Sequence, residues 1–233
     1  MKKSIFYGLL SLLLGISAFA DSANNKGGRN VEKVQNEPLF KDGKGYYSYK
    51  QPLDIALPDN KILIQYFYQY GCNVCLKGDD YLKAYAERNA DKVVLQRAPA
   101  FEKGNVFTAQ MQATFVEYGR PELADKYLFD SADTHPARKL INDNEAIKRW
   151  LTQNQVDIDR FHQLFASEKI HQQVEKAHAF YQIYAPPLAP IAVLNGKYIL
   201  IHNTLYNDDY TYAVLDFLVD KLHNEKQQTQ ENK

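Results

Sequence analysis

The sequence has few cysteines and no net charge, and each of these features excludes a class of protein. The 233 residues include two cysteines, and the 28 Lys and Arg balance the 28 Asp and Glu to a net charge of zero. A chain of this length buries enough apolar surface to fold without disulfides, so the cysteines are not needed as staples. A neutral chain is also not expected to bind nucleic acid or another polyanion.

Phosphate-binding and metal-binding motifs are lacking as well. No glycine-rich loop follows an apolar run, and no internal repeat is present. Two cysteines provide fewer ligands than the four that a structural zinc site needs. His171 and His178 lie seven residues apart on one predicted helical face, but nothing in the sequence brings them to the cysteines. A metal site remains the weaker alternative, and we expect no metal or organic cofactor.

The first twenty residues have the pattern of a secretory signal peptide. Two lysines precede an apolar stretch from Ile5 to Phe19, and Ala18-Phe19-Ala20 provides small residues for cleavage. The stretch is short for a bilayer span and is interrupted by Ser and Gly, which argues against a membrane anchor. We predict cleavage after Ala20 and export to the periplasm, where dithiols tend to become disulfides.

The chain after residue 45 begins with strand-like segments around one helix. A first strand is predicted within residues 46–57, and KILIQYFYQY at 61–70 is an apolar and aromatic run typical of a strand buried on both faces. Residues 73–89 have helical spacing, and KVVLQRAP at 92–99 is again strand-like. Strand, helix and strand predict a parallel β-α-β unit.

The second half of the chain is predicted to be helical before it returns to strands. Residues 104–184 carry only helical signals, with Asn, Asp or Ser at several predicted starts. Residues 191–194 and 197–201 are joined by an Asn-Gly turn and predict a hairpin. An amphipathic helix follows at 210–223.

Cys72 and Cys75 lie where the aromatic strand ends and the helix begins. A thiol at a helix N-terminus faces unpaired backbone amides that stabilise its thiolate form, which favours Cys72 as the nucleophile. Cys75, one turn later, can form a disulfide with Cys72 or resolve a mixed disulfide. Two alternatives are a purely structural disulfide, which would constrain little because its loop is very short, and a pair of inert buried thiols.

Pro190 is the second unusual feature. It directly precedes the predicted strand at 191–194, where proline cannot donate a hydrogen bond to the sheet. The bond between Ala189 and Pro190 is therefore a candidate cis peptide.

These features together resemble the thioredoxin superfamily and, within it, the periplasmic thiol:disulfide oxidases of the DsbA family. The resemblance covers about residues 46–223, from the aromatic strand and its C-x-x-C to Pro190 and the N-G-K-Y of the hairpin. It implies an α/β thioredoxin fold with an inserted all-helical domain. The predicted segments are the signal peptide 1–20, a polar lead-in 21–45, the first part of the thioredoxin fold 46–103, the helical insert 104–184 with its last helix returning to the sheet, the second part of the thioredoxin fold 185–223 and a disordered tail 224–233.

The resemblance also implies roles for individual residues. Cys72 would be the exposed attacking cysteine, Cys75 the buried resolving one and Pro190 a cis-proline facing the disulfide, with Ala189 offering its backbone to an extended substrate. The implied partners are reduced or unfolded exported proteins and a quinone-linked membrane reoxidant of the DsbB kind. We expect a monomer with no cofactor besides the disulfide.

The chain departs from the family pattern around the motif. Typical members have Pro-His between the cysteines, whereas this chain has Asn73 and Val74, and a valine side chain cannot hydrogen-bond to a thiolate. Tyr66 stands six residues before Cys72, where the family often has a buried acid. Both changes predict a less stabilised thiolate and therefore a weaker oxidant.

Further polar and aromatic residues flank the motif. Asp79 and Asp80 stand where the family commonly has two acidic residues, and the alternative is that both are exposed charges on an early helical turn. Tyr68, Tyr70 and Tyr206 are candidates for an aromatic rim near the site.

We therefore predict a periplasmic thiol:disulfide oxidoreductase that donates its Cys72–Cys75 disulfide to exported proteins. One alternative is the same fold acting as a reductase or an isomerase, although residues 21–45 are too few and too polar for a dimerisation domain of an isomerase. Another is a periplasmic chaperone or assembly factor that does not require the disulfide.

Overall fold

A computed structural model describes residues 38–132 and 137–231 of the chain. The predicted signal peptide and most of the predicted lead-in lie outside these residues, so both stay predictions. Across the described ranges, no helix combines the length and the apolar character that crossing a bilayer requires.

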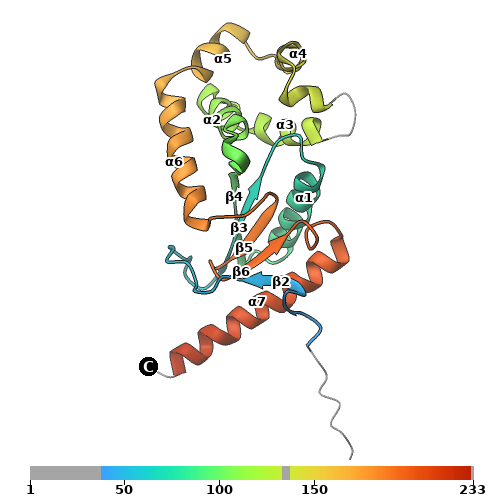
Figure 1. Cartoon of the computed structure of the whole chain (residues 1–233), viewed down its shortest axis with the longest axis vertical. Coiled ribbons are helices and arrows are strands. Elements are labelled where there is room, and N and C mark those ends of the chain that lie inside the picture. Colours follow the sequence, from blue (N-terminus) through green and yellow to red (C-terminus); the bar gives the residue numbers. More distant parts are fainter. Residues whose placement is uncertain (1–37, 133–136, 232–233) are drawn as a thin grey trace, which may run out of the picture. The chain divides into compact units, whose positions relative to one another are not determined.

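Within the described residues, six strands form one sheet in the order β1-β2-β6-β5-β3-β4 (Figure 1). The strands are β1 (Lys41–Asp42), β2 (Gly45–Ser48), β3 (Ile62–Tyr68), β4 (Val93–Pro99), β5 (Ile191–Leu194) and β6 (Tyr198–Ile201). Every residue of β3 is buried, as predicted for a central strand. The first strand was predicted within residues 46–57, but the observed strand β2 ends at Ser48, where its pairing with β6 ends.

The β-α-β prediction is confirmed. Helix α1 (Asn73–Arg88) connects β3 to β4, which pair in parallel over their whole length, while β5 pairs antiparallel with the other side of β3. Successive β3 side chains enter two separate apolar clusters. Tyr66 packs in the cluster with Leu82 of α1, and Phe67 packs in the cluster with Tyr184. The strand is therefore covered on both faces, which explains its continuous apolar sequence.

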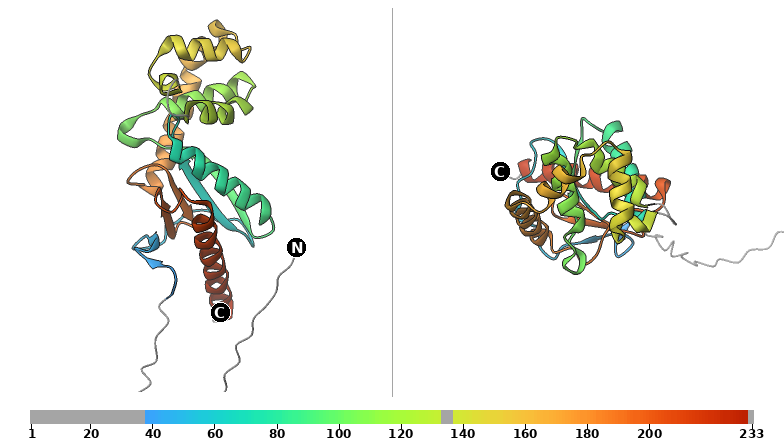
Figure 2. Two further views of the ribbon diagram at one scale, coloured as in Figure 1. Left: turned by 90° about the vertical axis from the view of Figure 1, so that its right-hand side faces the viewer. Right: turned by 90° about the horizontal axis from the view of Figure 1, so that it is seen from above.

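The predicted helical insert is present. Its helices are α2 (Phe107–Tyr118), α3 (Glu122–Ala132), α4 (Asn144–Gln153), α5 (Ile158–Phe165) and α6 (Glu168–Tyr184), with short 3-10 turns η1 (Glu102–Gly104) and η2 (Ala137–Ile141). Asp143, Asp157 and Ser167 cap the starts of α4, α5 and α6 with their side chains. Figures 1 and 2 show the insert at one end of the sheet, with α6 returning along it.

The prediction of a disordered tail at 224–233 is wrong over most of that range. Helix α7 (Asp208–Glu231) continues eight residues beyond His223, to Glu231, and only 232–233 lie outside the described residues. Glu225 ties this extension to the sheet, because its carboxylate accepts hydrogen bonds from Lys197 Nζ at 2.6 Å and from the Tyr198 hydroxyl at 2.7 Å. Such tertiary contacts hold a polar helix end that its own sequence would leave frayed.

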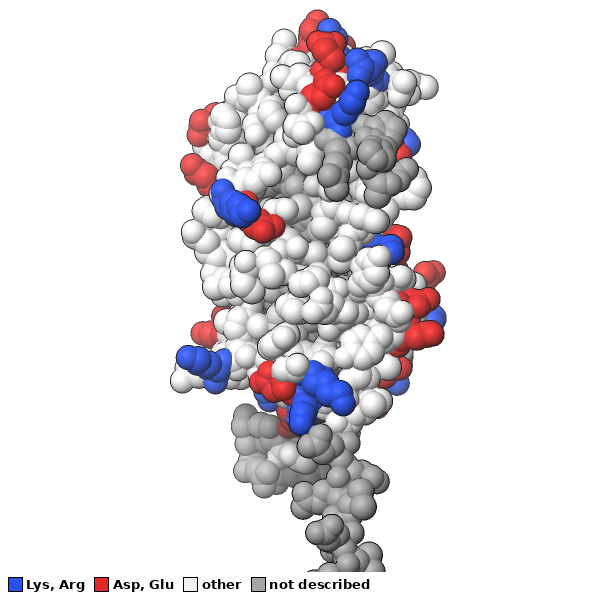
Figure 3. All heavy atoms as spheres, turned by 45° about the vertical axis from the view of Figure 1, so that its right-hand side comes forward, with Lys and Arg blue, Asp and Glu red and all other residues white. Residues whose placement is uncertain are grey.

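Charged side chains on the face seen in Figure 3 lie mostly in small groups of mixed sign. Described Lys and Arg side chains lie beside Asp and Glu side chains rather than gathering into one extended basic patch on this face. The pattern agrees with the balanced composition of the chain.

Candidate redox-active site

The cysteine motif is placed by a sharp turn between β3 and α1. Gly71 has a φ of +75°, a conformation that glycine adopts readily, and a side chain here would meet Ile141 Cδ1 of the insert at 2.8 Å. Cys72 follows in an extended conformation as the N-cap of α1, and its Sγ accepts a hydrogen bond from the Cys75 backbone N–H at 3.1 Å. The first sulfur therefore lies at the helix N-terminus, as the sequence indicates.

Cys72 and Cys75 form a disulfide, and its two sulfurs belong to residues of very different exposure. Cys72 is partly exposed, whereas Cys75 is completely buried in the cluster between the sheet and α1. Between them, Asn73 is exposed and Val74 is partly buried. An incoming thiolate therefore has access to the sulfur of Cys72 rather than to that of Cys75.

Pro190 lies at the same end of the sheet as the disulfide. Ile191, the first residue of β5, pairs with Phe67, one residue before the end of β3. The Ala189–Pro190 peptide bond is cis, Pro190 is buried and Ala189 is partly buried. The antiparallel register thus brings two segments that are more than a hundred residues apart in the sequence to the same end of the sheet.

Tyr66 lies underneath the start of α1. Its side chain is completely buried, and its hydroxyl donates a hydrogen bond to the Cys75 carbonyl oxygen at 2.6 Å. Burial raises the pKa of Tyr66 well above its ordinary value, so the hydroxyl remains a donor. A side chain on Gly78 would meet this hydroxyl at 2.8 Å, so glycine gives the tyrosine its room. Tyr66 connects the sheet to the backbone of the resolving cysteine.

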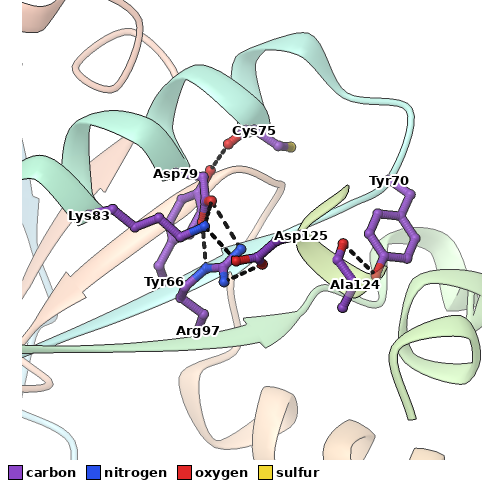
Figure 4. A network of polar contacts seen from close by, with 8 residues as sticks. All are labelled: Tyr66, Tyr70, Cys75, Asp79, Lys83, Arg97, Ala124 and Asp125. Atoms are coloured by element: carbon purple, nitrogen blue, oxygen red, sulfur yellow. Dashed lines mark hydrogen bonds and ion pairs between the residues drawn. The ribbon is translucent and has the colours of Figure 1, made fainter. Parts of the chain in front are cut away.

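Asp79 is buried, so the alternative that it is an exposed charge is wrong. Its carboxylate accepts two hydrogen bonds from Arg97, at 2.5 Å from Nε and 3.0 Å from Nη2, and forms an ion pair with Lys83 Nζ at 2.8 Å (Figure 4). Asp125 of α3 binds the other side of the same two cations, at 2.6 Å from Arg97 and 2.9 Å from Lys83. Asp80, by contrast, is exposed.

The four charged groups join three elements and sum to zero. Asp79 and Lys83 come from α1, Arg97 from β4 and Asp125 from α3, so the network attaches the insert to the sheet beside the disulfide. Burial opposes the charge of Arg97, but Asp79 and the other partners outweigh this and raise the pKa of Arg97. Because the network is neutral, it places no net charge below the cysteines.

Arg97 was not predicted as a site residue. The sequence did contain one sign of its role, because Arg97 interrupts the otherwise strand-like KVVLQRAP. In the structure, the parallel register places Arg97 beside Tyr66. A buried arginine requires a carboxylate, and Asp79 one turn after Cys75 was a candidate on the adjoining helix.

Comparisons with known proteins find similarity to thiol:disulfide interchange proteins. No model of a known protein family matches the chain. The chain is 34% identical over 228 residues to an uncharacterized protein of Haemophilus influenzae, covering 95% of this chain and 97% of that protein. It is 25% identical over 213 residues to the thiol:disulfide interchange protein DsbA of Azotobacter vinelandii, covering 91% and 94% of the two chains. The chain is a DsbA-like protein with a C-x-x-C disulfide.

A solved structure shows the same fold. The crystal structure of Pseudomonas aeruginosa DsbA superimposes on this chain with a TM-score of 0.64 at 24% identity, covering 81% of this chain and 97% of that one. The DsbA-like chain therefore has an α/β thioredoxin fold with an inserted helical region, as predicted, and it carries a C-x-x-C disulfide.

Two of the three tyrosines predicted for an aromatic rim do not form one in this DsbA-like chain. Tyr68 and Tyr70 are buried and pack against neighbouring tyrosine rings, with centroids 6.0 Å apart between the two, so neither forms a rim. Tyr206 is 52% exposed, and Lys77 Nζ lies 4.1 Å from its ring centroid. The even-numbered residues of β3 lie on the face that α1 covers, which takes Tyr68 into the core.

The metal alternative gains no support from the described part of the DsbA-like chain. No group of three or more His, Cys, Asp or Glu residues in residues 38–132 and 137–231 is arranged to hold a metal ion. His178 instead packs its ring against Phe101, with centroids 4.8 Å apart.

Proposed function

We propose that this DsbA-like chain is a periplasmic enzyme that donates its Cys72–Cys75 disulfide to exported proteins. The observation that carries the proposal is the asymmetry of the pair, with Cys72 partly exposed at the start of α1 and Cys75 fully buried. One sulfur is open to attack from outside, and the other is held where only its partner reaches it.

Exchange proceeds in two steps. A substrate thiolate attacks Cys72 Sγ and forms a mixed disulfide, while the bond to Cys75 breaks and Cys75 takes the electron pair and then a proton. A second substrate thiolate attacks the substrate sulfur of the mixed disulfide, which forms the substrate disulfide and releases Cys72 as a thiolate. Two electrons pass from the substrate dithiol to the protein disulfide. The Cys75 N–H, which donates to Cys72 Sγ at 3.1 Å, stabilises the released thiolate together with the helix N-terminus.

The neighbouring residues position the reaction. The backbone of Ala189, before Pro190, pairs with the extended substrate at the end of the sheet that carries the disulfide. Tyr66 holds the Cys75 backbone through its hydroxyl, 2.6 Å from the carbonyl oxygen. A quinone-linked membrane protein of the DsbB kind then reoxidises the dithiol, and the protein works as a monomer.

A second candidate is a reductase with the same site. The observation that favours it is the apolar side chain of Val74 and the uncharged Tyr66, neither of which stabilises a thiolate as a histidine or a shifted acid does. A less stable reduced form lowers the reduction potential and favours electron donation.

The deciding experiment equilibrates the purified protein with glutathione buffers and measures the fraction of Cys72–Cys75 disulfide. A reduction potential of about −120 mV makes the protein a disulfide donor, whereas a reduction potential of about −270 mV makes it a reductase. Cys72→Ser must lose all oxidation of a reduced polypeptide. Full function of Cys72→Ser in cells would overturn both candidates and support a chaperone or assembly factor instead.

A further inference from the structure

A cleft opens beside the disulfide, between the start of α1 and the helical insert. It has a volume of about 640 Å³ and is lined by residues of α1, α3, η2 and α4. Asn73, the residue after Cys72, forms part of its wall together with Leu76. The cleft therefore begins at the residue that follows Cys72, and its volume lies within the range of ligand sites.

One side of the cleft is apolar. Phe129 of α3 is 65% exposed although it is a large aromatic side chain, and Trp150 of α4 and Leu76 of α1 continue the surface. A contiguous apolar surface with a polar rim is typical of a site that contacts a partner.

The other side of the cleft carries two cationic groups. Lys139 of η2 and Arg149 of α4 line the cleft, and in the described part of the chain neither forms an ion pair. The one described carboxylate in the lining, Asp130, already accepts a hydrogen bond from Trp150 Nε1 at 2.7 Å and pairs with Lys126 at 2.8 Å.

A second acid that interacts with these cations is also engaged. Asp143 caps α4, and the pKa of its carboxyl lies below the ordinary value because it accepts hydrogen bonds from the Ala146 and Glu145 amides, with smaller effects of Arg149 and Lys139. A carboxylate brought from outside would therefore meet two cations and a wall of apolar side chains.

We propose that this cleft binds the segment next to the reacting cysteine of a polypeptide substrate, and that it selects segments with acidic and apolar residues. The proposal rests on the proposed exchange at Cys72. An extended chain advances about 3.3 Å per residue, so the first few residues beside a cysteine bonded to Cys72 reach the cleft. The matching charge favours a carboxylate there over a cation.

The test measures oxidation of three reduced two-cysteine peptides that differ only beside the first cysteine, with Glu-Phe, Gln-Phe or Lys-Phe. For the wild-type protein we expect kcat/KM to be highest for the Glu-Phe peptide and lowest for the Lys-Phe peptide. Arg149→Glu or Lys139→Glu should lower the Glu-to-Lys ratio of kcat/KM about fivefold, and the double variant about tenfold or more. Lys148→Glu is the matched control, because Lys148 is an exposed cation on α4 that does not line this cleft, and it should leave the ratio unchanged.

Two further measurements keep the outcomes distinct. Oxidation of dithiothreitol measures the activity of the disulfide independently of the cleft. If the protein does not oxidise dithiothreitol, the proposed function is overturned. If it oxidises dithiothreitol but has equal kcat/KM for all three peptides, the cleft proposal is overturned. Raising the salt concentration should reduce the wild-type preference for the Glu-Phe peptide by screening. A preference that does not respond to salt, or that responds equally to Lys148→Glu, also refutes the charge argument. Phe129→Ser should slow all three peptides alike.

Discussion

Replacing Asp79 by asparagine tests the buried charge network beside the disulfide. The Asp79 side chain is 2% exposed and holds Arg97 through two hydrogen bonds and Lys83 through an ion pair. Asp79→Asn keeps the volume of the side chain but removes its charge. Arg97, whose side chain is 20% exposed, then retains only Asp125 as a carboxylate partner.

The expected cost follows from burial. Removing one partner of a buried ion pair costs about 3–5 kcal/mol, because the other charge stays buried and unpaired. Arg97 keeps Asp125 and some contact with solvent, so we expect the lower end, about 3 kcal/mol. The matched variant Asp125→Asn removes a carboxylate that is 51% exposed, and for such pairs the loss is about 1 kcal/mol or less.

Urea unfolding of the oxidised protein measures both variants, with the slope of the transition as a check that the unfolded states stay comparable. The free energy of unfolding should fall clearly more for Asp79→Asn than for Asp125→Asn. Equal losses in the two variants would refute the reasoning, because burial would then not decide the strength of the network.

Three further predictions address other parts of the chain. Tyr66→Phe should lower the free energy of unfolding by about 1 kcal/mol, since it removes one buried hydrogen bond to the Cys75 carbonyl, and an unchanged urea midpoint would contradict this. Gln65→Leu should raise the thermal midpoint by about 2–4 °C, because Gln65 is 1% exposed and its Oε1 has no hydrogen-bond partner in the described chain, whereas a lower midpoint would mean that the amide is satisfied. Glu225→Gln should destabilise the protein at about pH 6 but not at about pH 3. Burial opposes the charge of Glu225, but the hydrogen bonds from Lys197 and Tyr198 outweigh it and lower the pKa of Glu225 below its ordinary 4.5. The stabilisation by the charged carboxylate is therefore present above the ordinary pKa and is lost as the pH falls through the lowered one. Urea midpoints of both proteins across this range check it, and a pH-independent difference would contradict it.

Local patterns were sufficient for much of the site. The aromatic run of β3, the helical spacing after it and the strand-like segment of β4 predicted the β-α-β unit, and the position of Cys72 at the helix start followed from that unit. Helical signals predicted helices in residues 104–184, and the position of Pro190 made its peptide bond a candidate for cis. The resemblance to the DsbA family added that these helices interrupt a thioredoxin fold. These features depend on residues close together in the sequence or on a motif that the family shares.

Other properties depend on residues that only the folded chain brings together. Asp79 was open to interpretation as an exposed charge, and it is buried because Arg97 arrives on β4 and Asp125 on α3. Tyr68 was a candidate for a rim, and it is in the core because α1 covers that face of β3. Helical periodicity ends at His223, yet α7 continues because Glu225 meets the hairpin.

The sequence by itself determined the type of fold, the reactive cysteine pair and which cysteine starts the helix, because capping, periodicity and motif spacing act over a few residues. The tertiary structure alone decided which charges are paired, which tyrosines are buried and where a cleft opens between Asn73 and Arg149. Those properties depend on distances between side chains from different elements, and no spacing along the chain specifies such distances.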